Sequence, residues 1–124
     1  MAMITKEITD KIKNSIEKIL DDNKAKDIIT MDLEGKSDVC NYMIIASGTS
    51  DRHVITIAEK IIYHLKHEEE NISPISEGLN EGKWALIDAA GIAVHIFHPE
   101  TREYYDLETL WSSPKSRSSS TKKQ

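Results

Sequence analysis

The N-terminal segment repeats hydrophobic and polar positions with the period of a helix. Its aliphatic residues recur mainly at steps of four and three, and lysine and glutamate fill the opposite side. The aliphatic set is Ile4, Ile8, Ile12, Ile16, Ile19 and Leu20. We predict an amphipathic helix over residues 3–21, whose stripe packs on the core or on a dimer partner. The mixed polar face disfavours a membrane anchor.

Two strands are predicted next. Residues 27–33 alternate, with Ile29, Met31 and Leu33 on one side, and residues 34–37 form a turn. Residues 42–46 are a near-continuous apolar run, which is typical of a strand inside a sheet. Residues 47–50 interrupt this run.

A second helix is expected to start after Ser50, a favourable N-cap, with Asp51 at the positive end of the helix dipole. Its buried stripe is Val54, Ile57, Ala58, Ile61 and Leu65. Residues 67–71 end this helix, residues 72–76 are extended, and residues 77–83 form a loop.

The C-terminal third predicts a hairpin and a last helix. Strands 84–89 and 92–98 are joined by a tight turn at Ala90 and Gly91. Pro99 opens a helix over residues 100–111. The element order α-β-β-α-β-β-β-α predicts an α+β (mixed α/β) domain, with a single sheet of about five strands covered mainly on one face by helices.

Length and composition indicate one domain, residues 1–111, followed by a tail. Residues 112–124 are basic and serine-rich and contain no apolar residue to bury, so we expect them to be disordered. The only cysteine, Cys40, cannot form an internal disulfide. We expect no membrane span, signal peptide or transit peptide, and therefore a cytoplasmic protein.

The charge is unevenly distributed. The chain has a net charge of -5, but the tail carries four basic residues and no acidic one, so residues 1–111 hold 12 basic against 21 acidic groups, a net of -9. An acidic domain of this kind suits a basic protein partner. We expect no specific nucleic acid partner, because phosphate contacts need Lys and Arg. The tail is either passive or an electrostatic tether to RNA.

Candidate sites of chemistry are few. The junction 46–53 resembles either an anion site at a helix N-terminus or a capped turn. A nucleotidyltransferase would also need two nearby carboxylates for Mg²⁺, and no Asp-x-Asp pair exists. His64 and His67 share a helix face without a third metal ligand, and His95 and His98 point to opposite sheet faces. We expect no catalytic, cofactor-binding or metal-binding residue.

The hairpin offers a docking surface instead. If Ile87, Val94 and Ile96 pack on the helices, the opposite face of the sheet carries the other alternate positions. These are Trp84, Leu86, Asp88, His95 and Phe97. An exposed aromatic and polar face is typical of protein docking, with Trp as a hot spot. The alternative is that Trp84 belongs to the core.

Several segments together resemble the Iojap/RsfS ribosomal silencing factor family. They are residues 26–29, 33–37 and 42–54, Glu77-Gly78 followed by Trp84, Asp88, and residues 94–97 and 102–111. The resemblance covers about residues 4–112. Two acids of the family pattern are missing, because Asn41 stands before Tyr42 and the turn after Asp88 has no second acid.

The resemblance implies a non-enzymatic function without cofactors. Family members bind the large ribosomal subunit through the large-subunit ribosomal protein numbered fourteen, block subunit joining sterically and repress translation when nutrients are limiting. Organelle relatives assist ribosome assembly, and some members are dimers. The family fold is similar to a nucleotidyltransferase core without its catalytic carboxylates.

Alternation and resemblance together place the partner-binding site on the hairpin. Trp84 would be the apolar anchor with Leu86 and Phe97, Asp88 and Glu77 would pair with basic residues, and His95 would lie at the edge. Two other readings remain open. One is a nucleotidyltransferase-like enzyme that uses the Ser47-Gly48 turn, and the other is a dimeric interaction module with a non-ribosomal partner.

Overall fold

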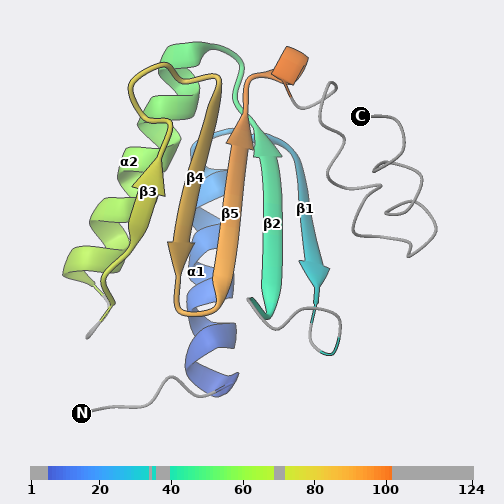
Figure 1. The fold of residues 1–124 in the computed structure, drawn as a ribbon, viewed down its shortest axis with the longest axis vertical. Coiled ribbons are helices and arrows are strands. Elements are labelled where there is room, and N and C mark those ends of the chain that lie inside the picture. Colours follow the sequence, from blue (N-terminus) through green and yellow to red (C-terminus); the bar gives the residue numbers. More distant parts are fainter. Residues whose placement is uncertain (1–5, 34, 36–39, 69–71, 102–124) are drawn as a thin grey trace.

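Five strands form one mixed sheet in the order β1-β2-β5-β4-β3, as the computed structural model of the chain shows (Figure 1). The strands are β1 Lys26–Asp32, β2 Tyr42–Ser47, β3 Ile75–Glu77, β4 Trp84–Ala89 and β5 Ile92–Phe97, and the helices are α1 Lys6–Asp22 and α2 Asp51–His67. The structure describes residues 6–33, 35, 40–68 and 72–101. The predicted α+β class with a single sheet of about five strands is confirmed.

Both helices pack on the same face of the sheet (Figure 1). In α1, Ile12, Ile16 and Leu20 are fully buried in the core that α1 shares with α2 and the sheet. The five predicted stripe residues of α2 are also fully buried. The described part of the α1 stripe therefore belongs mainly to the core of one chain. Neither described helix is long and apolar enough to cross a membrane.

The apolar run of β2 lies inside the sheet, as predicted. Every residue of β2 is buried, and the strand pairs with β1 on one side and β5 on the other. The β2–β5 pair is parallel, and all other pairs are antiparallel. Strand β5 is thus the middle strand of the sheet, with two strands on each side of it.

The predicted hairpin is confirmed, with a two-residue turn between β4 and β5. Ala90 and Gly91 have φ values of 53° and 81°, the left-handed values that the tightest hairpin turns require. This turn sets the register, so that Trp84 lies opposite Phe97, Leu86 opposite His95, and Asp88 opposite Ala93.

Some predicted bounds differ. The extended stretch expected over residues 72–76 is the short strand β3, which includes Glu77 from the predicted loop because Glu77 pairs with Leu86. Strand β5 ends at Phe97, one residue early. Residues 99–101 are helical, but the remainder of the predicted helix 100–111 and the tail 112–124 lie outside the described residues.

Candidate protein-binding face

The candidate site is the sheet face opposite the two helices. Ala85 and Ile87 point into the helix-side core, so the alternate residues of β4 point the other way. Directly paired residues share a face, which places Glu77 beside Leu86 and Ile75 beside Asp88. We call this surface the hairpin face. It consists of Ile75, Glu77, Trp84, Leu86, Asp88, His95 and Phe97.

Exposure falls across the hairpin face from the sheet edge to the middle strand. Glu77 and Asp88 are exposed, Trp84 and Leu86 are half-buried, and His95 and Phe97 are only 8% and 1% exposed. The expectation of an exposed face was therefore wrong for His95 and Phe97. Both lie on β5 between two neighbouring strands, and Phe97 packs in a cluster with Met43 and Ile45.

The aromatic residues of the hairpin face form one stacked cluster. The ring centres of Trp84 and Phe97 are 5.0 Å apart and those of His95 and Phe97 are 6.0 Å apart, with both pairs stacked. The Trp84 Nε1–H donates a hydrogen bond to His95 Nδ1 at 3.0 Å. The indole is therefore held in place by its neighbours, with part of its surface accessible to a partner.

His95 is a neutral support rather than the edge contact that the sequence suggested. Burial lowers the pKa of His95 from 6.5 to about 4. Its Nδ1 accepts from Trp84, so in the neutral imidazole the proton is on Nε2. His95 therefore orients Trp84 and cannot serve as a cationic contact at neutral pH.

Ile75 is the residue of this face that the sequence analysis missed. Its side chain is 65% exposed, although it is a large aliphatic residue. The signal was available, because Ile75 and Glu77 are two positions apart and must share a face once 75–77 is a strand. Ile75 adds apolar surface next to Asp88 at the edge of the sheet.

The loop 78–83 connects β3 to Trp84 and lies close to the backbone of β4 and of α2. Gly78 and Gly82 have φ values of 82° and 74°, which favour glycine. A Cβ at Gly78 would overlap the Trp84 carbonyl, and one at Gly82 would overlap the Asp51 carbonyl at the start of α2. A cavity of about 660 Å³ lies beside Trp84, and its lining includes Gly78, Asn80, Glu81, Lys83, Glu100 and Thr101.

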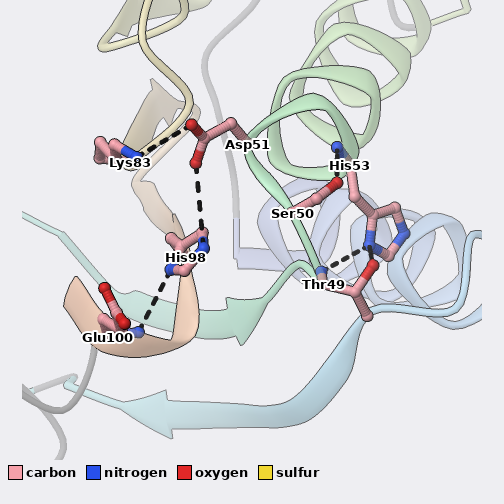
Figure 2. Close-up of polar contacts among 7 residues, drawn as sticks. All are labelled: Thr49, Ser50, Asp51, His53, Lys83, His98 and Glu100. Carbon is pink, nitrogen blue, oxygen red and sulfur yellow. Dashed lines mark hydrogen bonds and ion pairs between the residues drawn. The ribbon is translucent and has the colours of Figure 1, made fainter.

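Asp51 joins this loop to α2 and to the end of β5 (Figure 2). Lys83 Nζ lies 2.9 Å from Asp51 Oδ2, and this hydrogen bond and the Asp51 charge raise the pKa of Lys83. His98 Nε2 lies 4.0 Å from Asp51 Oδ1. The Glu100 N–H donates to His98 Nδ1 at 3.3 Å, so Nε2 of neutral His98 carries its proton toward Asp51.

The turn before α2 is a cap rather than a built anion site. The Ser50 hydroxyl accepts from the His53 N–H at 3.1 Å, and the Thr49 N–H donates to His53 Nδ1 at 2.8 Å (Figure 2). His53 Nε2 lies 2.8 Å from the Asn23 carbonyl oxygen just after α1. The capped-turn alternative is confirmed. Within the described ranges, no three His, Cys, Asp or Glu side chains converge as metal ligands would.

Comparisons with known proteins agree with this architecture. Residues 5–124 match the family described as ribosomal silencing factor during starvation. The chain is 45% identical to the ribosomal silencing factor RsfS of Zymomonas mobilis, over 74% of this chain and 68% of that protein. It is 31% identical to the mouse protein named mitochondrial assembly of ribosomal large subunit protein 1, over 76% of this chain and 42% of that protein.

A solved structure carries the same fold. The crystal structure of a Chromobacterium violaceum protein superposes with a TM-score of 0.78 at 36% identity, covering 84% of this chain and 86% of that one. The relatives are named as silencing or assembly proteins and not as enzymes. The chain therefore belongs to the ribosomal silencing factor family, whose motifs its sequence resembles.

Proposed function

We propose that this protein binds the large ribosomal subunit through the large-subunit ribosomal protein numbered fourteen. The bound protein blocks joining of the small subunit by its bulk and represses translation when nutrients are limiting. It acts in the cytoplasm. It needs no cofactor, because steric obstruction requires only a protein bound at the right place on the subunit.

The observation that carries the proposal is the composition of the hairpin face. A half-buried tryptophan, Trp84, shares a sheet face with the exposed acidic residues Glu77 and Asp88, and neither α1 nor α2 packs on this face. A rigid aromatic ring that still has accessible surface is the usual centre of a protein interface. Glu77 and Asp88 can pair with arginine or lysine of a basic partner.

Charge supports the same type of partner. Residues 1–111 carry a net charge of -9, which repels nucleic acid phosphates and attracts a basic protein. The stacked pairs behind Trp84 hold its ring in one orientation, which lowers the entropy lost on binding. Within the site, Trp84 and Leu86 make the apolar contact, Glu77 and Asp88 make the ionic contacts, and His95 and Phe97 support the ring from below.

Co-sedimentation with separated ribosomal subunits tests the proposal. We expect the protein to pellet with the large subunit and not with the small one. Trp84→Ala should raise the Kd by about thirtyfold, the effect expected of an interface hot spot. Asp88→Lys should raise it by about tenfold, because it places a cation against a basic partner.

Matched controls separate the hairpin face from general effects. Tyr63→Ala removes a 62% exposed aromatic from α2, and Asp22→Lys reverses an exposed charge at the end of α1. Both controls should leave the Kd unchanged. If Trp84→Ala and Asp88→Lys fold normally and bind as the parent does, the placement of the site is wrong.

The same experiment distinguishes silencing from assembly, the role named for the mouse relative. Binding to the large subunit with inhibited subunit joining supports silencing, whereas binding without inhibition favours assembly. Analytical ultracentrifugation of the protein alone would show whether it forms a homodimer.

A further inference from the structure

We propose that Asp51 is a positioning residue of the hairpin face, which holds the loop 78–83 on α2 and thereby fixes Trp84. This inference rests on the proposed function for its consequence in binding. Its structural basis is independent of that function. It assigns a role in partner recognition to a residue on the helix side of the molecule.

Asp51 contacts the residue before Trp84 and the residue after Phe97, the two ends of the stacked Trp84–Phe97 pair. Its Oδ2 is 2.9 Å from Lys83 Nζ, one residue before Trp84, and its Oδ1 is 4.0 Å from His98 Nε2, one residue after Phe97 (Figure 2). The His98 N–H in turn donates to the Lys83 carbonyl at 2.9 Å. The Asp51 carboxylate therefore holds in place the end of the β4–β5 hairpin where Trp84 and Phe97 stack.

The backbone of the loop 78–83 also lies close to the backbone of α2. A Cβ on Gly82 would overlap the Asp51 carbonyl, so loop and helix touch main chain to main chain. The Gly82 N–H donates to the Gly78 carbonyl at 3.3 Å, which closes the loop on itself. A displacement of Lys83 is therefore transmitted to Trp84, the next residue.

The surroundings of the Asp51 carboxylate indicate a role beyond the stability of α2. Its Oδ1 is buried, and among the described residues no donor lies within hydrogen-bond distance of it, since His98 Nε2 is 4.0 Å away. A carboxylate that only complemented the helix dipole could leave both oxygens in water. A buried acceptor whose nearest donor is beyond hydrogen-bond distance costs free energy, and such a cost in a native structure calls for an explanation, which a positioning role supplies.

The test uses the Trp84 indole N–H as a probe that does not depend on ribosomes. The chain has two tryptophans, so a ¹⁵N-labelled sample gives two indole signals, and Trp84→Phe identifies the relevant one. We expect Asp51→Asn to shift and broaden the Trp84 signal. Asp22→Asn, which removes the carboxylate of the exposed Lys18–Asp22 pair at 3.0 Å, should leave it unchanged.

The affinity for the large subunit provides the second readout. We expect Asp51→Asn to raise the Kd about fivefold or more. Lys83→Met should act in the same direction, and the double variant should be no worse than Asp51→Asn alone, because Asp51→Asn already removes the contact with Lys83. Gly82→Ala, which forces the loop away from α2 without a charge change, should act in the same direction.

The outcomes are distinct. An unchanged Trp84 signal and an unchanged Kd in Asp51→Asn overturn the inference, as do additive effects of Asp51→Asn and Lys83→Met. If the parent itself does not bind the large subunit, the proposed function fails. A Trp84 signal that moves in Asp51→Asn and Gly82→Ala still supports the positioning role. If Asp51→Asn does not fold, Lys83→Met and Gly82→Ala carry the test.

Discussion

His95 supports the hairpin face from the middle strand as a neutral side chain. Its Nδ1 accepts the Trp84 indole hydrogen bond at 3.0 Å, and it is only 8% exposed. Protonation of Nδ1 would abolish this hydrogen bond and place a charge in a buried position. The orientation of Trp84 is thus linked to the protonation state of His95.

This linkage predicts a loss of stability in mild acid. The folded state holds the pKa of His95 near 4 against an ordinary value of 6.5, so the unfolded chain binds the proton first as the pH falls. Stability from this residue is complete above the unfolded pKa and is lost as the pH falls toward 4. Between about pH 7.5 and about pH 5 the loss is about 2 kcal/mol.

Chemical denaturation at these two pH values measures the effect. His95→Gln keeps an acceptor for Trp84 but does not titrate, so its free energy of unfolding should fall by about 2 kcal/mol less than that of the parent. Equal losses in parent and variant would contradict the account of His95.

At the residue level, the sequence predicts side-chain direction better than burial. Alternation placed Trp84, His95 and Phe97 on one face correctly. It could not show that His95 and Phe97 are buried, because β5 lies between β4 and β2, and β2 is distant from β5 in the sequence. Ile75 was missed because the extended stretch was expected over residues 72–76, whereas pairing with β4 makes residues 75–77 the strand and places Ile75 beside Asp88.

At the element level, the helices carry the core on which the hairpin rests. Ile16 of α1 is fully buried, whereas Ile19 in the same helix is only half-buried at the core margin. We expect Ile16→Ala to lower the free energy of unfolding by about 3 kcal/mol, through lost burial and a residual cavity.

Thermal or urea unfolding measures the loss of stability in Ile16→Ala, with Ile19→Ala as the matched control. The same substitution at the half-buried site should cost about 1 kcal/mol. Similar losses at the two positions would mean that the apolar stripe of α1 is not packed as described.

The elements themselves were largely predictable. The period of 3.6 located the helix stripes, Ser50 marked the start of α2, and the Ala90-Gly91 pair marked the hairpin turn. Strand β3 was less well predicted, because its three residues form a strand only through pairing with β4. The Asp51–Lys83 contact joins residues 32 positions apart, and no local pattern reveals it.

At the scale of the whole molecule, charge is divided between an acidic body and a basic tail. We expect removal of residues 112–124 to weaken binding to the large subunit at low salt, if the tail contacts ribosomal RNA. Four basic residues are lost, so the salt dependence of log Kd should become less steep by a slope of about 3.

Titrations at several salt concentrations measure this slope for the full chain and the truncated chain. A variant with the four basic tail residues replaced by glutamine controls for tail length. Trp84→Ala should weaken binding at every salt concentration, because its contact is apolar. An unchanged slope after truncation would show that the tail does not contact RNA.

The most direct test of the central claim is subunit joining followed by light scattering. Large subunits are incubated with the protein, small subunits are added, and the rise in scattering is recorded for the parent and for Trp84→Ala. We predict that the parent suppresses the rise and that Trp84→Ala restores it at the same concentration. A full rise with the parent, at a concentration that saturates large-subunit binding, would contradict silencing by obstruction.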